Sequence, residues 1–328
     1  MGIHIVLTAD RAGVIPTAFT ANIGTRIVLR LAGESEYAAA GVDADILDHS
    51  AGGRAVVNGY ELQVAVPGGV ADLSAQSTRI EALAVRLREA GLPDAEPVER
   101  LAGFIPSSDL PATVAGRPGF GVDDETLGPV GIPLDGLFVV TGPFGSGRST
   151  AMTTAIRAFR VAHPEFAAYL LVARKSALAG ATAWTEASTD ADDAEALASR
   201  LATLLEQSSA MPLDPLIIVI ENIGDFEGLS AESQVARLLK AARRAGVPVL
   251  AEADTVTAPA AWQVYSELKT ARAGIVLQPE ESDGLGLFRV PFPRVTRTDF
   301  PVGRGILVDS GKLARVQVAW SGPIAIDR

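Results

Sequence analysis

The sequence predicts an α/β fold, in which a mostly parallel sheet is covered by helices on both faces and is preceded by the C-terminal half of a similar module. Three observations lead to this prediction. Short apolar runs alternate with helix-length segments through the second half of the chain. A glycine-rich loop joins the first of these runs to the first of these helices. Segments of residues 2–66 return in the same order near the C-terminus.

The alternation of strands and helices is clearest between residues 137 and 251. Strands rich in β-branched residues, joined by right-handed helical crossovers, form a parallel sheet that is buried on both faces. We expect strands at 137–141, 168–172, 216–220, 247–251 and 274–278, helices from 149, at 191–207 and at 230–245, and a β-rich tail at 305–308 and 314–319. The inward stripe of the third helix is predicted to consist of Val235, Leu238, Leu239 and Ala242.

Composition excludes several classes of protein. The chain has 328 residues, of which 48% are hydrophobic and 20% charged, as in globular proteins with an ample core. No apolar run is long enough to span a bilayer, and the start lacks the basic region of a signal peptide. We therefore expect a cytoplasmic segment without membrane insertion, while an anchor elsewhere in a longer parent stays open. The absence of cysteine excludes disulfides and thiolate zinc sites. A formal net charge of −11 disfavours nucleic-acid binding over the whole surface.

The glycine-rich loop fits the phosphate-binding consensus G-x-x-x-x-G-K-[ST], except that Arg148 replaces the lysine. Its glycines allow successive backbone N–H groups to turn toward an anion, and the following helix adds its positive N-terminal end. We predict that the loop binds ATP and that Ser149 offers its hydroxyl to Mg²⁺; an ordinary glycine-rich turn is the alternative. The predicted nucleotide-binding residues are Gly142, Pro143, Phe144, Gly145, Ser146, Gly147, Arg148, Ser149 and Thr150.

A carboxylate that holds magnesium is expected where a later apolar strand ends, and Leu216–Asn222 ends in Glu221 and Asn222. Hydrolytic P-loop enzymes usually carry aspartate first and, in many families, a second acidic residue that activates water. Glu221 is one methylene longer than aspartate and stays a candidate Mg²⁺ ligand, whereas the amide of Asn222 cannot act as a general base. These altered catalytic positions and Arg148 together predict nucleotide binding with weak or absent hydrolysis.

The internal repeat predicts three parts: residues 1–69 as the C-terminal half of one module, 70–118 as an amphipathic helix and proline-rich linker, and 119–328 as a second module. The offset between matching residues grows only from 244 (Asp10 to Asp254) to 254 (Gln63 to Gln317). In the first part we expect a buried strand at 2–8, a strand at 26–30 and a hairpin at Asn58-Gly59, and the connecting helix at 71–91. The matching pairs are 2–10 with 246–254, 26–29 with 274–277, 53–54 with 303–304 and 62–66 with 316–320.

These residues resemble the FtsK/SpoIIIE family of P-loop motor ATPases, in particular the multi-module actinobacterial proteins that include the EccC ATPases of type VII secretion. Residues 2–11, 21–30 and 53–54 resemble the segment that follows the Walker B strand in that family. Residues 120–131 resemble the lead-in to the next module, and 291–294 with 316–319 its closing segment. The resemblance implies a RecA-like core, ring or string assembly with other modules, and ATP sites completed by a neighbour.

The resemblance also implies a role for Arg11, which resembles the arginine that follows the sensor strand and acts in trans; Thr255 takes that place in the second module. A surface arginine at a strand end is the alternative. Three hypotheses follow for the whole chain. It is a regulatory or substrate-docking terminal module that binds ATP, an active DNA-translocating ATPase when assembled with its full-length parent, or an interaction scaffold without nucleotide. DNA and secreted protein both stay open as cargo.

Overall fold

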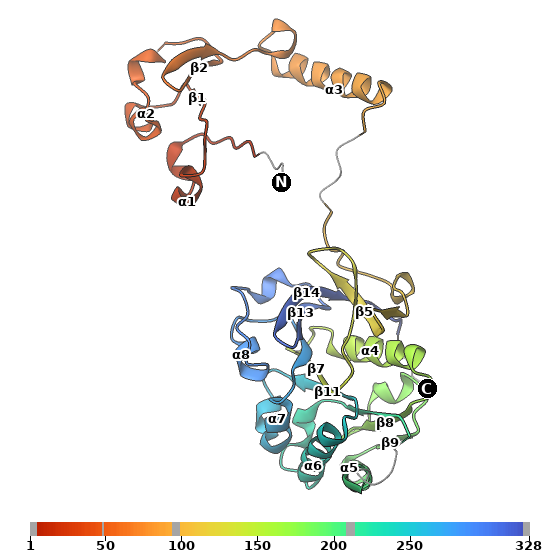
Figure 1. Cartoon of the computed structure of the whole chain (residues 1–328). Coiled ribbons are helices and arrows are strands. Elements are labelled where there is room, and N and C mark those ends of the chain that lie inside the picture. Colours follow the sequence, from red (N-terminus) through yellow and green to blue (C-terminus); the bar gives the residue numbers. More distant parts are fainter. Residues whose placement is uncertain (1–4, 48, 94–98, 208–213, 324–328) are drawn as a thin grey trace. The chain divides into compact units, whose positions relative to one another are not determined.

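The computed structural model describes residues 5–47, 49–93, 99–207 and 214–323. The chain divides into two compact units, which we call unit 1 (Met1–Pro97) and unit 2 (Val98–Arg328), each of which is described by itself (Figure 1). The boundary falls inside the segment predicted as helix and linker. Residues 99–118 belong to unit 2, where Ile105 is buried. The division into 1–69, 70–118 and 119–328, as a statement about modules, stays a prediction.

Unit 2 is built on one mixed sheet of eleven strands in the order β4-β5-β14-β13-β12-β7-β11-β10-β8-β9, with β6 paired to β5. The six strands from β12 to β9 are parallel to their neighbours, and the remaining pairs are antiparallel. The bounds are β4 Thr113–Val114, β5 Arg117–Asp123, β6 Pro129–Gly131, β7 Leu137–Gly142, β8 Ala167–Leu171, β9 Glu186–Ala187, β10 Leu216–Ile220, β11 Val249–Asp254, β12 Ala273–Leu277, β13 Arg304–Asp309 and β14 Lys312–Val318.

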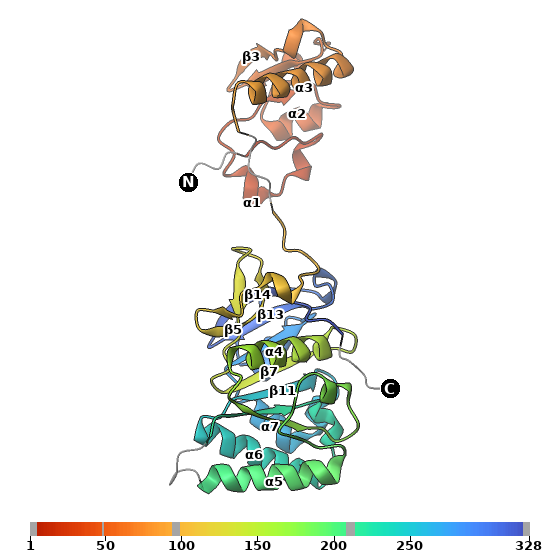
Figure 2. The same cartoon turned by 90° about the vertical axis from the view of Figure 1, so that its right-hand side faces the viewer.

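Helices cover both faces of this sheet, so the predicted fold class is confirmed. On one face, α4 (Arg148–Ala162) packs Met152, Ile156 and Phe159 against Phe138 and its neighbours. The other face is covered by α5 (Ala191–Gln207), α6 (Ala231–Ala245), α7 (Trp262–Leu268) and α8 (Asp283–Leu287), and α5 and α6 run side by side (Figure 2). Alternate residues of each strand face the two cores, as the pleat requires.

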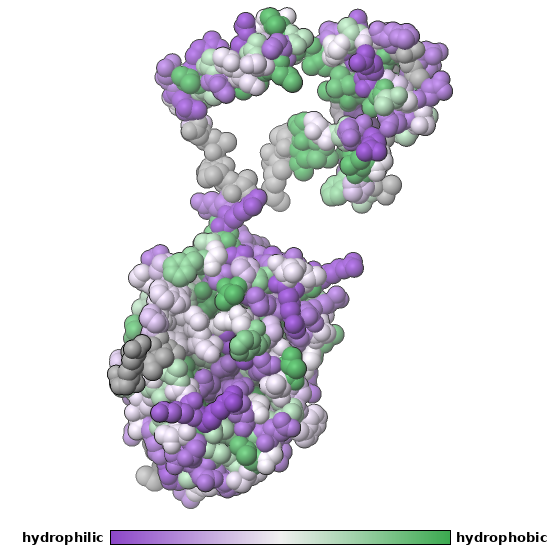
Figure 3. Space-filling model, turned by 180° about the vertical axis from the view of Figure 1, so that it is seen from behind, coloured by the Kyte–Doolittle hydropathy of each residue, from purple (hydrophilic) through white to green (hydrophobic). Residues whose placement is uncertain are grey.

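The predicted elements of unit 2 lie within a few residues of those observed, and α5 and β10 match their predicted bounds. The predicted stripe on α6 is buried, with Val235, Leu238, Leu239 and Ala242 each no more than 4% exposed. Apolar and polar side chains are interspersed over the face of unit 2 seen in Figure 3. Within the described parts of the chain, every helix is too short or too polar to cross a lipid bilayer.

Unit 1 contains a small antiparallel sheet, β1-β2-β3, formed by Val28–Leu29, Arg54–Val57 and Tyr60–Gln63. The predicted hairpin is confirmed, since Asn58 and Gly59 adopt φ of 50° and 80° between β2 and β3. Its helices are α1 (Thr17–Thr20), α2 (Glu34–Ala40) and α3 (Leu73–Glu89), and α3 matches the predicted connecting helix. No described residue of α3 is buried, so its apolar stripe is not covered by unit 1.

The internal repeat is confirmed by the pairing registers of the two sheets. Val28 pairs with Val56 in unit 1, and their counterparts Val276 and Ile306 pair in unit 2. Arg54 pairs with Gln63 as Arg304 pairs with Gln317. The corner before each arginine is also shared, because Gly53 and Gly303 both have positive φ, and each glutamine amide donates to the carbonyl just before that glycine at 3.1 Å. The shared register and corner geometry fit two copies of one folding unit.

The prediction of a buried strand at residues 2–8 is wrong for residues 5–8, which form no strand and are exposed; residues 2–4 lie outside the described residues. Val6, for example, is 91% exposed. The matching strand in unit 2, β11, is buried because it pairs with β7 on one side and β10 on the other. Residues 1–97 contain no counterpart of either neighbour in their described part, so this apolar run has no sheet to join.

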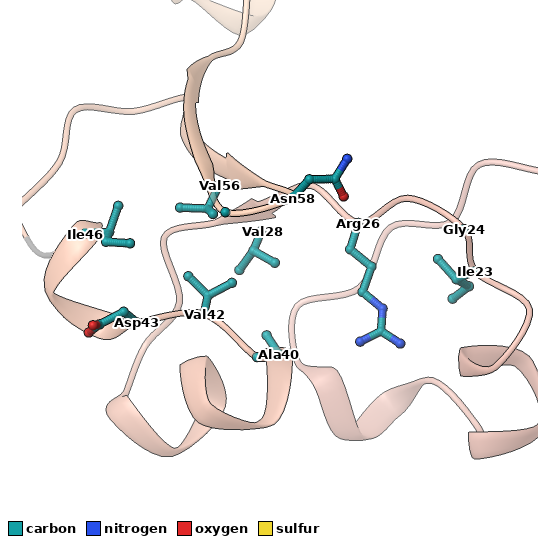
Figure 4. Close-up of a pocket in the computed structure, with 12 residues that line it drawn as sticks. Ile23, Gly24, Arg26, Val28, Ala40, Val42, Asp43, Ile46, Val56 and Asn58 are labelled. Carbon is teal, nitrogen blue, oxygen red and sulfur yellow. The ribbon is translucent and has the colours of Figure 1, made fainter.

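Unit 1 contains a hollow of about 300 Å³, which is lined by residues of β1 and β2 and of the segment that follows α2. Figure 4 shows Val28, Val42, Ile46 and Val56 around it, with Arg26 at one side. In unit 2 the counterparts of Val28 and Val56 are Val276 and Ile306, which are 0% and 4% exposed beneath the strands and helices of that unit. The hollow therefore lies on a face whose counterpart in unit 2 is covered, which fits the predicted half module.

Candidate functional site

The glycine-rich loop has the geometry of a phosphate cradle. Strand β7 ends at Gly142, and α4 begins at Arg148 after Gly147, which caps the helix with φ of 98°. Gly142 has φ of 156°, and a Cβ there would lie 2.7 Å from the carbonyl oxygen of Leu277. Side chains are therefore excluded where the backbone turns under the loop, and the positive end of a 15-residue helix faces the loop.

The Gly-Arg corner of the repeat supports this loop from the C-terminal tail. The N–H of Gly303 donates to the carbonyl of Ser146 at 2.9 Å. A Cβ on Gly147 would lie 3.2 Å from the same Gly303 nitrogen and 3.2 Å from a methyl group of Val302. Arg304, the next residue, is fixed by bonds to Gln317 and to the carbonyls of Leu101 and Ala102. The corner therefore contacts the loop at Ser146 and Gly147.

Arg148, which stands where the consensus has lysine, is tied to strand β11. Its Nε donates to Oε1 of Glu252 at 2.9 Å, and its Nη1 donates to the carboxylate of Asp254 and to the carbonyl of Gly142. The side chains of Arg148, Glu252 and Asp254 are 13%, 4% and 12% exposed. Parallel pairing of β11 with β7 places Asp254 beside Gly142, which brings these carboxylates under the loop.

The pKa values of this cluster reflect burial and pairing in different proportions. Burial raises the pKa of Glu252 to about 6, although bonding and charge attraction from Arg148 act in the opposite direction. Burial also favours the neutral form of Asp254, but bonds from Arg148 and from the N–H groups of Val256 and Thr257 lower its pKa overall. Arg148 has a raised pKa, because the two carboxylates outweigh its own desolvation. The guanidinium of Arg148 is therefore charged, and its two carboxylate partners hold it in place.

Glu221 and Asn222 lie at the end of β10, next to β11. Ile220 pairs with Ala251, so Glu221 and Glu252 follow side by side. Burial raises the pKa of Glu221, and the negative charge of Asp225 adds to this, while a bond from Ser176 and the charge of Arg174 oppose it. Asn222 adopts φ of 41°, a left-handed conformation that asparagine tolerates better than most residues.

Several buried polar atoms in this region have no hydrogen-bond partner among the described residues. They belong to the loop and to the ends of β10 and β11, and they are Ser146 Oγ, Asn222 Oδ1, Glu252 Oε2 and Thr255 Oγ1. Buried polar atoms are nearly always bonded in folded proteins, to protein, water or ligand. The hydroxyls of Ser146 and Thr255 can donate to a phosphate beside this loop, whereas Asn222 Oδ1 and an ionised Glu252 Oε2 only accept and call for a donor such as water.

The residues present also fit the predicted cofactor. No group of three or more histidine, cysteine or acidic side chains in the described ranges could hold a metal ion unaided. Mg²⁺, however, is commonly held by one or two protein ligands together with phosphate oxygens. Ser149 is exposed at the start of α4, and Glu221 is half-buried at the end of β10. Assignment of Mg²⁺ to Ser149 and Glu221 stays a prediction.

Comparison with known proteins shows which known fold the chain shares. The chain is similar to the cytoplasmic domain of the Thermomonospora curvata type VII secretion ATPase EccC, with a TM-score of 0.69 and 21% identity over 98% of this chain and 40% of that one. The chain has the fold of the EccC secretion ATPases. A second similar structure contains ATPases 2 and 3 of the same EccC with a signal sequence peptide, with a TM-score of 0.67 and 20% identity over 95% and 61%.

EssC ATPases 2 and 3 from Geobacillus thermodenitrificans are also similar, with a TM-score of 0.61 and 19% identity over 95% of this chain and 64% of that one. In sequence, 160 residues are 30% identical to the ESX secretion system protein EccC of T. curvata, which is 46% of this chain and 12% of that protein. No protein-family model matches the chain. The predicted resemblance is confirmed, and the chain spans about an eighth of its curated EccC relative.

The remaining residues that the sequence predicts for the site lie in different settings. Phe144 is 95% exposed at the tip of the loop, and Thr150 is exposed in the first turn of α4. Arg11 lies in unit 1, where it is exposed and 3.9 Å from the carboxylate of Asp10. Its counterpart in unit 2 is Thr255. Nothing in unit 1 or unit 2 tests the role of Arg11 in trans, which stays a prediction.

Sequence reasoning missed Glu252 and Asp254 as partners of Arg148. A signal was present, since both acids interrupt an otherwise apolar strand, two residues apart and therefore on one face. The repeat adds a second signal. Asp254 matches Asp10, whereas Glu252 matches Thr8, so the buried glutamate is particular to the second copy. Only the register of β11 against β7 reveals that these acids face Arg148.

We expect Glu252 to lower the stability of the protein as pH rises from about 4.5 to about 6. Its pKa is about 6 in the folded protein against an ordinary 4.5. The folded state therefore keeps a proton that the unfolded state has released, and stability falls across this window by about 2 kcal/mol. Denaturant unfolding of wild type and Glu252→Gln between pH 4 and pH 8 measures this effect, because the difference between the two curves cancels other groups. A difference that is independent of pH would contradict the assignment.

Proposed function

We propose that unit 2 binds ATP but hydrolyses it weakly or not at all, and that it acts as a regulatory or substrate-docking module of an EccC-like secretion ATPase. The observation that supports this proposal is a glycine-rich loop between β7 and α4 that has the shape of a phosphate cradle, while the residues around it differ from the predicted catalytic pattern. The loop from Gly142 to Ser149 keeps its shape, yet Arg148 is turned onto Glu252 and Asp254.

Binding is supported by the backbone of the loop and by the helix behind it. N–H groups at a helix N-terminus bind phosphate without the help of a particular side chain. The unpartnered hydroxyl groups of Ser146 and Thr255 provide further hydrogen-bond donors beside the cradle. Mg²⁺ bound with the nucleotide would neutralise phosphate charge, with Ser149 and Glu221 as its protein ligands. A nucleotide can therefore be held although Arg148 is engaged elsewhere.

Weak hydrolysis is supported by the way in which the acids at the described ends of β10 and β11 are already engaged. Asn222 stands where many hydrolytic relatives carry an acid, and its amide cannot accept a proton. Glu252 and Asp254 are occupied by Arg148. Asp225, which follows β10, is paired with Arg174. Among the described acids of this region that leaves Glu221, which is also the candidate magnesium ligand. One carboxylate serves both tasks poorly, since binding to a cation lowers its basicity.

The cargo we propose is a secreted protein rather than DNA. One similar EccC structure was obtained in complex with a signal sequence peptide. A formal net charge of −11 opposes contact with a nucleic-acid backbone. We further propose that this segment works in the cytoplasm, as the similar domain of T. curvata EccC does. There it would assemble with other modules of the same kind in a ring or a string.

Titration with a fluorescent ATP analogue, with and without Mg²⁺, tests the proposal. We expect saturable binding that strengthens with Mg²⁺, together with turnover far below the rate of about 10 s⁻¹ that is typical of enzymes. Absence of saturable binding would contradict the proposal and favour the hypothesis of an interaction scaffold without nucleotide. Brisk turnover, in this chain or in the assembled parent, would instead favour the DNA-translocating alternative, which requires an active ATPase.

A further inference from the structure

The contacts of Arg148 raise the question of what this side chain does when phosphate arrives. Three hydrogen bonds from Nε and Nη1 already join it to the chain, and two of them end on carboxylates. A carboxylate and a phosphate compete for a guanidinium through the same bidentate, charge-assisted geometry. A phosphate group must therefore take Arg148 from partners that satisfy it already, or bind without it.

The charges around the loop make this competition unequal. The strand ends and the segments after them carry the acids Glu221, Asp225, Glu252 and Asp254, against the three cations Arg148, Arg174 and Lys175. Arg174 is itself paired with Asp225 at 2.7 Å. The floor of the cradle is thus acidic, and charges that are partly buried are screened less by salt than exposed ones. An approaching triphosphate meets net repulsion from the side chains while the backbone attracts it.

We propose that Glu252 and Asp254 restrain Arg148 and thereby limit the affinity of the loop for nucleoside triphosphates. This inference rests on the proposed function, since it concerns the same nucleotide site. The two acids are affinity-setting residues that act through Arg148, and neither needs to touch the ligand. Glu252 is the stronger candidate for such a role, because it is buried on β11, leaves Oε2 without a described partner and has no acidic counterpart in the repeat.

Two isosteric substitutions test whether the charges of Glu252 and Asp254 restrain Arg148, because they remove charge and keep the size of the side chain. Glu252→Gln and Asp254→Asn each remove one negative charge and keep an oxygen that can still accept from Arg148 or from the backbone. For Asp254 that oxygen matters, because Oδ1 accepts from the N–H groups of Val256 and Thr257 at 2.8 and 3.2 Å. We expect each variant to bind the ATP analogue about tenfold more tightly than wild type, as loss of one nearby like charge implies.

The matched control is Asp309→Asn. Asp309 also pairs with an arginine, Arg117, but it lies at the opposite end of the sheet from the loop, beside Ala273 at the start of β12. Its removal changes the net charge by the same amount, and we expect affinity to stay within about twofold of wild type. Tryptophan fluorescence during thermal unfolding checks that each variant is folded. If Glu252→Gln is not folded, the affinity of Asp254→Asn for the ATP analogue tests the proposal by itself.

The outcomes distinguish this inference from the proposed function. Tighter binding by the two variants, or binding by them where wild type shows none, supports the restraint. Wild-type binding that weakens or stays unchanged in Glu252→Gln and Asp254→Asn overturns it and leaves the proposed function intact. Weakening in particular would mean that the two acids orient Arg148 so that Nη2, which bonds no described residue, meets the phosphate. Absence of binding in every variant overturns the proposed function and the restraint together.

Discussion

Replacing Arg148 by alanine is expected to lower the free energy of unfolding by about 3–5 kcal/mol, because it leaves two buried carboxylates without their cation. Glu252 and Asp254 are only 4% and 12% exposed, so water cannot take over the role of the guanidinium. All three tryptophans, Trp184, Trp262 and Trp320, lie in unit 2. Tryptophan fluorescence in a urea titration therefore reports the unfolding of the unit that contains the site.

The matched control for this prediction is Arg117→Ala. Arg117 also forms an ion pair, with Asp309, but the two side chains are 42% and 30% exposed. Exposed pairs contribute little, and we expect a loss of about 1 kcal/mol or less. Arg148→Lys should fall between the two, because an ammonium group can reach one carboxylate but cannot bridge both through a planar fork. Equal losses for Arg148→Ala and Arg117→Ala would contradict the buried cluster.

Gly147→Val is expected to weaken ATP binding by about a hundredfold or more, a free-energy change of roughly 3 kcal/mol. At φ of 98° a β-branched residue is strongly strained, and its Cβ would press on Gly303 and Val302 at 3.2 Å. The strain falls on the N-cap residue that precedes α4, so it displaces the N–H groups at the start of the helix. Equilibrium titration with the fluorescent analogue measures the loss.

Gly136→Val is the control for the loop substitution. Gly136 precedes β7 at the end of the strand away from the loop, and a Cβ there meets nothing within 4 Å. We expect its affinity for ATP to match that of wild type. Gly145→Ala adds an intermediate case, since its φ of 79° disfavours a side chain while the space around it is open. Unchanged binding in Gly147→Val would show that the nucleotide, if bound, does not use this cradle.

Local patterns were sufficient to predict much of the fold. Helix α5 and strand β10 follow from periodicity and β-branched composition, and the Asn58-Gly59 hairpin follows from turn chemistry alone. The repeat extended these predictions across the chain, and matching registers at Arg54 and Arg304 confirm it. Each of these features is encoded by residues close in sequence or by similarity between two segments.

Features that depend on distant neighbours could not be predicted in the same way. Residues 5–8 have the composition of a strand, but a strand also needs partners, and the described part of unit 1 supplies none for them. The bonds from Arg148 to Glu252 and Asp254 span more than a hundred residues. They exist only because β11 enters the sheet between β7 and β10, a topology that strand composition does not specify.

The central claim, that this module holds ATP without efficient hydrolysis, is tested most directly by the identity of the bound nucleotide. The full chain is incubated with Mg²⁺ and radiolabelled ATP, separated from free nucleotide by rapid gel filtration, and the bound label is resolved into ATP and ADP over time. We predict that label elutes with the protein and is still ATP after many minutes. Bound label that turns to ADP within seconds, or protein that elutes without label at saturating ATP, would contradict the claim.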